Sequence, residues 1–334
     1  MTKIKSILAV MLILALIFNL PPVAQAQNII EAGAEDTNVV SSTVTEAVYE
    51  DTGEVQEYMI AFEEKVDVDE FIEAEMGSRK VIEQNEEQPN SKIATLMLTE
   101  TEKEQWEQNP EIKYIEPNSP VSMLTEGVPV KEGDAYTYRN VDGDSISWGL
   151  YSIGGDQAHQ AGMKGAGAKI AVLDTGIAEH ADLRVNGGVS FVNGVADFED
   201  DNGHGTFVAG IIGAQINGQG IAGVAPDAEL YAVKVLNAEG KGTYAQVVNG
   251  IDWAINNQMN IISISFGGME SSEILREAVI RANDAGILVV AALLVTQVQG
   301  KRLSFIQRVL RKLCPLALLP DHSNVPFIQV QALN

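Results

Sequence analysis

The stretch from Lys169 to Gly213 constrains this chain more than any other. An apolar run at Ile170–Leu173 ends in the tripeptide Asp174-Thr175-Gly176, which is typical of a buried parallel strand that carries a carboxylate at its C-terminal end. Thirty residues after Asp174, His204 stands between two glycines and begins a helical pattern. An Asp at a strand end and a His at the head of a helix are two members of a hydrolytic triad, whose third member is a nucleophilic Ser.

Strands and helices alternate through residues 145–292, which predicts an α/β domain. Further apolar strand patterns follow the Asp174 strand, and helical patterns begin near His204, Thr243 and Ser272. Such an alternation builds a parallel sheet with helices on both faces. We therefore predict a three-layer fold in which a parallel sheet is flanked by helices. The strands beyond Asp174 are expected at 230–236, 261–266 and 287–292.

The first 26 residues are predicted to be a secretory signal peptide. Two lysines precede an apolar run at 7–20, and Ala24-Gln25-Ala26 supplies the small residues that a signal peptidase requires. We expect cleavage after Ala26 and secretion. We expect no membrane association afterwards, because no second segment is long and apolar enough to span a bilayer. Residues 27–56 are polar and acidic and are predicted to form a flexible lead-in.

Residues 57–118 are predicted to form a small α+β domain before the α/β domain. Strand and helical patterns alternate there, and Thr99 and Glu102 have the spacing of a capping box. The order strand–helix–strand–strand–helix–strand is that of a ferredoxin-like split βαβ unit. The second helix is expected to run to Asn109, before Pro110. Residues 119–144 contain several Pro and Gly residues and are predicted to be a linker.

The charge distribution argues against a nucleic acid partner, and the cysteine content excludes a disulfide framework. Between Ile29 and Asn118, 24 acidic side chains stand against six basic ones, so we expect no nucleic acid partner, because phosphates would be repelled. We interpret this surface as solvated rather than as a site for a cationic partner. The single cysteine, Cys314, excludes a disulfide framework.

The residues around the two predicted triad members resemble those of one family. Asp-Thr-Gly alone is weak evidence, since aspartic proteases carry the same tripeptide. Together with the spacing of thirty residues and the sequence Asn-Gly-His-Gly-Thr-x-Val-Ala-Gly, it resembles the subtilase family of subtilisin-like serine proteases, whose triad has the order Asp, His, Ser. The resemblance implies that Asp174 orients His204 and that His204 is the general base for cleavage of protein or peptide substrates. It also implies that residues 57–118 are an inhibitory propeptide bound to the catalytic domain, with a maturation site in 119–144; the alternative is an unrelated small domain.

Two further sites are implied by the same resemblance. Residues 261–268 resemble the strand that lines the substrate cleft, so Ser265, Phe266 and Gly267 are candidates for contact with substrate; the alternative is plain strand packing. Bacterial subtilases often hold a structural Ca²⁺ near the start of the mature domain, and the alternative here is a polar loop without metal. The matching oxygen donors would come from Asp144, Asp182, Gln215, Asn217, Gln219 and Ile221.

The resemblance ends abruptly at about Ala292. No Gly-Thr-Ser-Met-Ala element follows, and neither Ser304 nor Ser323 has the surroundings of a family nucleophile. When each codon's last base is read with the first two of the next, residues 292–298, 305–308 and 323–334 can encode three tracts typical of subtilases, in the family's order. We therefore predict that the tail 293–334 is out of frame and that the domain at 145–292 is an incomplete, inactive subtilisin-like domain. The alternative is a divergent tail whose basic, apolar stretch at 303–319 binds a membrane surface or a partner.

Three functions are thus compared. The first is a subtilisin-like serine endopeptidase. The second is a pseudoprotease without activity, whose acidic propeptide-like domain inhibits another protease or assists its folding. The third is a metallohydrolase with Asp174 and His204 as metal ligands. The sequence disfavours the third, because His159, His180 and His322 do not lie at the spacing of metal ligands.

Overall fold

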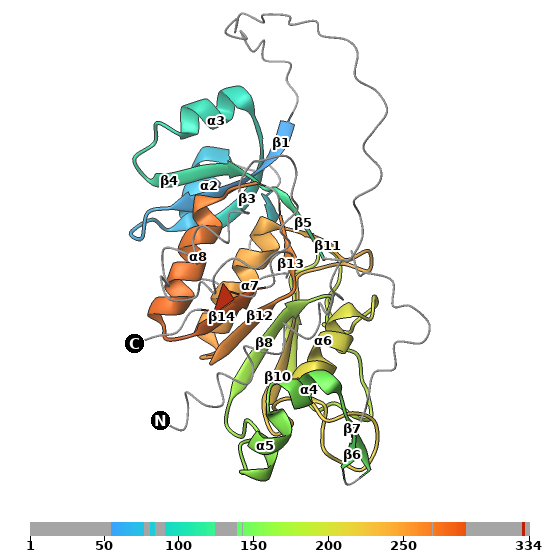
Figure 1. The fold of residues 1–334 in the computed structure, drawn as a ribbon. Helices are drawn as coiled ribbons and strands as arrows, with labels where there is room; N and C mark the ends of the chain where they lie inside the picture. The colour runs from blue at the N-terminus through green and yellow to red at the C-terminus, as the bar shows by residue number, and fades with distance from the viewer. Residues whose placement is uncertain are drawn as a thin grey trace, which may run out of the picture.

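The computed structural model describes residues 55–76, 81–83, 91–123, 139–141, 143–268, 270–291 and 329–330. The predicted signal peptide, nearly all of the acidic lead-in and the tail after residue 291, except Gln329–Val330, lie outside these residues. Figure 1 shows a small unit formed by the first part of the chain beside a larger α/β unit. No helix among the described residues has the length and apolar character needed to cross a membrane.

The larger unit is built on a six-stranded sheet with the order β15-β14-β12-β8-β10-β9. Its strands pair in parallel, except for the antiparallel pair of β14 and β15. The predicted parallel sheet is therefore confirmed, and β8, which ends in Asp174, lies in its interior. The strands are β8 (Lys169–Asp174), β9 (Val185–Ser190), β10 (Glu229–Lys234), β12 (Ile261–Ile264), β14 (Leu288–Ala291) and β15 (Gln329–Val330).

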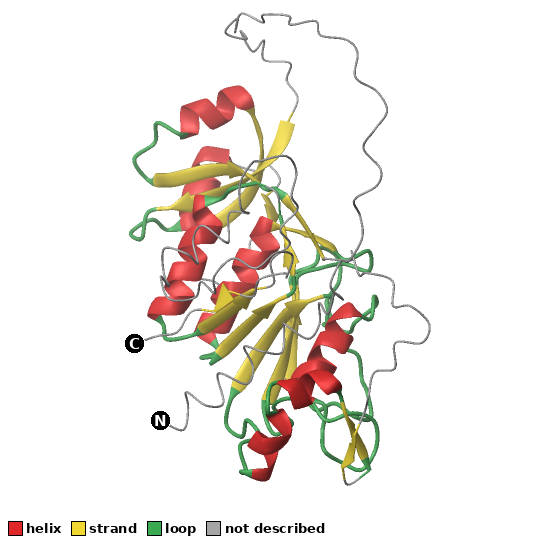
Figure 2. Cartoon of the chain, in the orientation of Figure 1, coloured by secondary structure: helices red, strands yellow, loops and turns green. Residues whose placement is uncertain are grey.

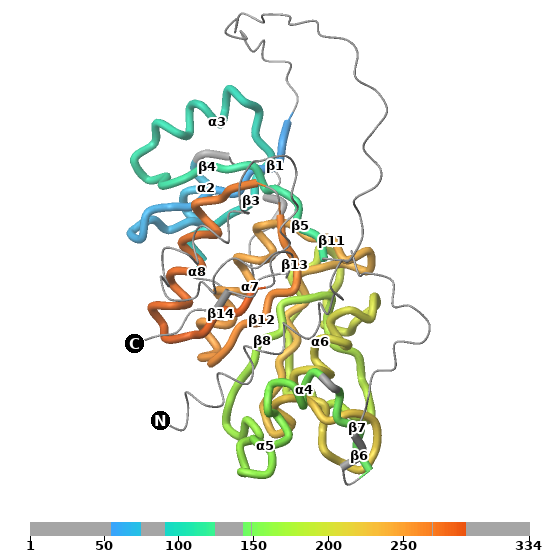
Figure 3. Tube along the Cα trace, viewed as in Figure 1, coloured from blue at the N-terminus to red at the C-terminus, as the bar shows by residue number. Residues whose placement is uncertain are grey.

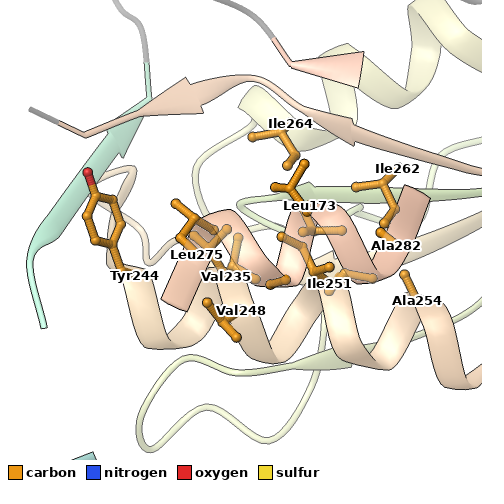
Figure 4. Close-up of a cluster of buried hydrophobic side chains, with 14 of the residues drawn as sticks. Leu173, Val235, Tyr244, Val248, Ile251, Ala254, Ile262, Ile264, Leu275 and Ala282 are labelled. Atoms are coloured by element: carbon orange, nitrogen blue, oxygen red, sulfur yellow. The ribbon is translucent and has the colours of Figure 1, made fainter. Parts of the chain in front are cut away.

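Helices cover both faces of this sheet (Figure 2). Helices α7 (Tyr244–Asn256) and α8 (Glu273–Asp284) cover one face, where Leu173 of β8 packs with Ile251 and Leu275 (Figure 4). Helix α6 (His204–Gly213) covers the opposite face, against Ile170 and Val172. Because side chains alternate along a strand, Asp174 points to the same face as Val172, toward the helix that begins with His204.

Helices α7 and α8 begin where the sequence patterns place them. The Thr243 side chain accepts a hydrogen bond from the Gln246 N–H and the Gln246 side chain accepts one from the Thr243 N–H, which is the reciprocal pattern of a capping box. The Ser272 side chain caps α8 by accepting from the Leu275 N–H at 3.0 Å. These local signals explain why both helices begin at the predicted residues.

A short hairpin and a helix form the start of the predicted α/β domain. Strand β7 (Asp144–Ile146) pairs with β6 (Arg139–Val141), and helix α4 (Trp148–Ser152) follows at once. The Ser147 side chain accepts from the Leu150 N–H at 3.2 Å, so a serine cap turns the chain into a helix. Helix α5 (Gly155–Gln160) comes next.

The small unit has the predicted order of elements. Its antiparallel sheet has the strand order β2-β3-β1-β4, as in a split βαβ unit. Thr99 and Glu102 form the predicted capping box of α3, but the helix ends at Trp106, before the expected Asn109. A proline disfavours helical geometry in the residue before it. Here the helix ends at Trp106, earlier than Pro110 alone would require. The elements are β1 (Val55–Phe62), α2 (Val68–Met76), β2 (Val81–Glu83), β3 (Ile93–Thr99), α3 (Glu100–Trp106) and β4 (Ile112–Pro117).

The segment after β4 joins the small unit to the large one (Figure 3). Strand β5 (Pro120–Met123) lies between β11 (Lys241–Thr243) and β13 (Phe266–Gly267) in a three-stranded sheet. The predicted linker 119–144 therefore begins with a paired strand. Sequence reasoning missed it because both of its partners lie more than a hundred residues away, so no local pattern indicates the pairing.

Candidate active site

Asp174 and His204 meet at the C-terminal end of β8. The Nδ1 atom of His204 lies 2.7 Å from Oδ1 of Asp174. The Asp174 side chain is fully buried, whereas the His204 side chain retains 16% of its exposure. The carboxylate is therefore shielded from water while the imidazole reaches the surface, as a general base must.

The arrangement fixes the proton on one nitrogen of the imidazole. A hydrogen bond from Nδ1–H to Asp174 leaves Nε2 as the acceptor. Burial disfavours the charged ring, but the hydrogen bond to Asp174 and the charges of Asp174 and Asp200 outweigh it and raise the pKa of His204 above its ordinary value. Asp174 Oδ1 also accepts from the Thr175 N–H at 2.8 Å. These contacts suit a base that must hold a proton briefly.

The two glycines beside His204 are explained by the packing. Gly203 has φ of 101°, a left-handed conformation that favours glycine. A Cβ atom at Gly205 would lie 2.1 Å from the carbonyl oxygen of Gly176 and 3.2 Å from Cβ of Asp174. Any side chain at Gly205 would therefore push α6 away from the strand end and separate His204 from Asp174.

Sequence reasoning missed three residues around the pair. Lys234 is fully buried at the end of β10, where its Nζ donates to the Thr175 carbonyl and, at 2.6 Å, to Asp201. Asp200 accepts hydrogen bonds from both sides of the site. The run of three acidic residues shortly before His204, Glu199–Asp201, was the available signal, because carboxylates near a helix start can accept hydrogen bonds from its first N–H groups.

The edge predicted to bind substrate is occupied by a segment of the chain itself. Phe266 pairs with Met123 and Gly267 with Ser122 in antiparallel register, and β11 pairs with the other side of β5. The Phe266 side chain is buried in the core, so the pairing uses the backbone, as recognition of an extended peptide requires. Ser265 is fully buried and lies outside this pairing.

Carboxylate and amide groups of the small unit cap two helices of the large one. The Glu116 carboxylate accepts from Ser272 Oγ at 2.7 Å and from the Glu273 N–H at 2.8 Å, both at the start of α8. Asn118 Oδ1 accepts from the Ala245 N–H at 2.9 Å, at the start of α7. A negative charge at a helix N-terminus is stabilised by the helix dipole, so these contacts orient the small unit on α7 and α8.

The six predicted calcium ligands lie close together. Asp144, which is 1% exposed, accepts from the N–H of Asn217 at 3.2 Å. Asp182, which is 5% exposed, accepts from the Ile221 N–H at 3.0 Å and from the Asn217 side-chain amide at 3.2 Å. The Gln215 N–H donates to the Asp182 carbonyl, and the Gln219 N–H to the Asn217 side-chain oxygen. The amide therefore presents its nitrogen to Asp182 and would have to turn for its oxygen to face an ion.

Within the described part of the chain, no three His, Cys, Asp or Glu side chains gather as a metal site. A cation beside Asp182 would thus need carbonyl and amide oxygens in addition to carboxylates, which is typical of Ca²⁺. The Asp174–His204 pair likewise has no third ligand of these types among the described residues, so its geometry does not favour the metallohydrolase hypothesis.

The site and fold together define the class of protein. An Asp–His pair at the carboxyl end of a parallel sheet has the geometry of two members of a hydrolytic triad. Residues 165–293 match the sequence model of the subtilase family. This part of the chain therefore belongs to the subtilase family, and the family and fold class predicted from sequence are confirmed.

Characterised relatives of the chain are proteases. It is 42% identical over 239 residues to the thermostable alkaline protease of Halalkalibacterium halodurans, covering 72% of this chain and 60% of the relative. It is 49% identical over 148 residues to subtilisin BL of Lederbergia lenta, covering 44% of this chain and 55% of the relative. It is 43% identical over 206 residues to the minor extracellular protease Epr of Bacillus subtilis, covering 60% of this chain and 30% of the relative. The chain thus spans at most about three fifths of each of these relatives.

Proposed function

We propose that this chain is the precursor of a secreted subtilisin-like serine endopeptidase. The observation that carries the proposal is the buried hydrogen bond from His204 to Asp174. It lies in a domain whose strand edge at Phe266–Gly267 pairs with an extended backbone. The substrates are proteins or peptides bound as an added strand. Export depends on residues 1–26, and the name of the extracellular relative Epr agrees with this destination.

In this mechanism His204 Nε2 removes the proton of a serine hydroxyl as the serine attacks the scissile carbonyl. Asp174 holds the tautomer and stabilises the imidazolium. The 334 residues contain no Gly-Thr-Ser-x-Ala element, so His204 has no family nucleophile to activate within this chain. We therefore expect the chain by itself to hydrolyse no peptide bond above background.

A chimera tests this proposal directly. Residues 1–291 would be joined to the C-terminal part of the Halalkalibacterium relative, which supplies the family's serine. We expect the chimera to cleave a peptide substrate and to react with a fluorophosphonate, because the serine then meets a correctly oriented base. The 334-residue chain and a chimera with that serine replaced by alanine are the controls and should do neither. An inactive but folded chimera would contradict the proposal, and labelling of the 334-residue chain would contradict the predicted inactivity.

A second function is favoured by the contacts of the small unit. Strand β5 pairs with the edge predicted to bind substrate, while Glu116 and Asn118 cap α8 and α7. We propose that residues 57–123 act as an inhibitor and folding aid of the catalytic domain to which they are attached. The same segment could inhibit a separate, intact subtilase, because it recognises helix N-termini and a strand edge rather than a particular side chain.

Replacing Glu116 by alanine should weaken this inhibition. The change removes the acceptor for Ser272 and for the first N–H group of α8. We expect the inhibition constant of a peptide of residues 27–123 against subtilisin BL to rise about tenfold, which corresponds to about 1.4 kcal/mol. The matched control is Glu111→Ala, since Glu111 is exposed and, among the described residues, its hydrogen bonds are made by its backbone. Equal inhibition by both variants would show that the cap contributes nothing.

We also propose that Asp182 binds a structural Ca²⁺, together with the donors at Asp144, Gln215, Asn217, Gln219 and Ile221. Two buried carboxylates beside a loop rich in carbonyl oxygens support the proposal. Saturating Ca²⁺ should stabilise the chain by about 2–3 kcal/mol at a hundredfold excess over Kd. Thermal unfolding in Ca²⁺ and in EGTA would measure this difference. It should disappear in Asp182→Asn and persist in Asp197→Asn, an exposed control; identical unfolding of the parent chain in both buffers would refute the site.

A further inference from the structure

The first turn of α6 takes its hydrogen-bond acceptors from other parts of the chain. The N-cap residue, Gly203, offers no side chain, so the first N–H groups of the helix need other partners. The His204 N–H donates to Asn202 Oδ1 at 3.2 Å, the Gly205 N–H to Thr175 Oγ1 at 2.9 Å, and the Thr206 N–H to Asp200 Oδ2 at 2.9 Å. The position of His204 therefore depends on these side chains.

Asp200 is the residue on which this arrangement converges. Its Oδ1 accepts from Thr175 Oγ1 at 2.8 Å, from the Gly203 N–H at 2.9 Å and from the Asn202 N–H at 3.0 Å. Its Oδ2 accepts from Thr206 Oγ1 at 2.6 Å and from the Thr206 N–H at 2.9 Å. Five donors face these two oxygens. Only an ionised carboxylate offers acceptors on both sides without a competing donor.

The hydroxyl groups of Thr175 and Thr206 connect Asp200 to the segments that follow Asp174 and His204. Thr175 Oγ1 donates to Asp200 and accepts from the Gly205 N–H, so it links the residue after Asp174 to the residue after His204. Thr206 Oγ1 donates to Asp200 and accepts from the Ala178 N–H at 2.9 Å. The turn after β8 and the first turn of α6 are thereby held to a common carboxylate.

We propose that Asp200 is a positioning residue that holds the His204 imidazole in register with the Asp174 carboxylate. This inference rests on the proposed function in one respect: it takes the pair to be the base and its orienting group. The network joins the residues next to Asp174 and His204, and Asp200 makes no hydrogen bond to the ring.

The charge of Asp200 has a second consequence. Desolvation raises the pKa of Asp200, but the hydrogen bonds from Thr206, Gly203 and Asn202 outweigh it and keep the pKa below its ordinary value. Asp200 is thus anionic at neutral pH, and its charge favours the protonated form of His204. Other charged groups near this turn are Asp174, which bonds His204, and the Lys234–Asp201 pair, which contacts the Thr175 carbonyl. The exposed Glu199 carboxylate, next to Asp200, accepts from the Glu179 N–H.

The full 334-residue chain can test the inference without catalysis. NMR would follow the His204 imidazole, assigned among the four histidines by its loss in His204→Gln. In Asp200→Asn the amide nitrogen must face at least one of the donors that now bond a carboxylate oxygen. We expect the titration midpoint of His204 to fall, because the carboxylate charge that favours the protonated ring is removed. We also expect its Nδ1 proton to exchange with water at least about tenfold faster as the bond to Asp174 loosens. Asp197→Asn removes the same charge from an exposed position of the same loop and should change neither.

A second pair of variants separates position from charge. Thr206→Val keeps Asp200 ionised but breaks its link to Ala178, so the Nδ1 proton should exchange faster while the His204 midpoint changes less than in Asp200→Asn. Thr206→Ser keeps the hydroxyl and should restore slow exchange. If the Nδ1 proton exchanges with water as slowly in both Asp200→Asn and Thr206→Val as in Asp197→Asn, the inference is overturned. An inactive chimera would argue against the proposed proteolysis, but it would leave a positive NMR result for Asp200 intact.

Discussion

Replacing His204 by alanine in the active chimera is expected to reduce kcat by about 10⁶-fold, and Asp174→Asn by about 10⁴-fold. These orders of magnitude are those found for subtilisin-type triads, in which the base and nucleophile act as one unit and the Asp contributes less. Here the 2.7 Å hydrogen bond between the His204 and Asp174 side chains provides the physical reason. Alanine removes the proton acceptor, whereas asparagine leaves an imidazole that can adopt the wrong tautomer.

The comparison needs an internal control and a pH profile. His180 is exposed and bonds only a neighbouring backbone N–H among the contacts the structure shows, so His180→Ala should leave kcat within about twofold. In the parent chimera kcat/KM should rise with pH as His204 loses its proton, with a midpoint above the ordinary pKa of histidine because Asp174 and Asp200 stabilise the charged ring. A loss of less than about a hundredfold in His204→Ala would show that the residue is not the base.

The Asp174–His204 pair was predictable because its signals are local. An apolar strand that ends in Asp174 and a glycine-flanked His204 can each be recognised within a few residues, and the alternation of side chains along β8 then places Asp174 on the α6 face. The capping boxes at Thr99 and Thr243 are local for the same reason. The structure adds the distance between the two side chains and their burial, which no pattern in the sequence specifies.

The surroundings of the pair could not be predicted, because they depend on contacts between distant segments. Lys234 reads in the sequence as one polar residue of strand β10, yet it is buried at the end of that strand and bonds the turn after β8. Asp200 lies in a loop whose composition predicts only a turn. Strand β5 lies in a stretch that reads as a linker, and only its partners at 241–243 and 266–267 make it a strand. Pairing of this kind depends on the folded chain as a whole.

The largest effect on stability near the site is expected from Asp201→Ala. Lys234 is fully buried, and its ammonium has two hydrogen-bond partners, the Thr175 carbonyl and the Asp201 carboxylate. Without Asp201 the buried charge keeps only a neutral acceptor. Removing one partner of a buried pair costs about 3–5 kcal/mol, and since the Asp201 side chain is 48% exposed we expect the lower end, about 3 kcal/mol of unfolding free energy.

The reverse substitution separates the cost of an unpaired charge from the value of the pair. Lys234→Met keeps much of the buried aliphatic volume, returns the half-exposed Asp201 to water, and leaves only the Thr175 carbonyl without its donor. It should therefore cost only about 1 kcal/mol. In the double variant, Asp201→Ala should add little, because no buried ammonium remains to be neutralised. Urea unfolding of the full chain and the three variants measures all four free energies. If Lys234→Met costs as much as Asp201→Ala, the two substitutions remove the same favourable contact, and the buried charge is not what makes Asp201 necessary.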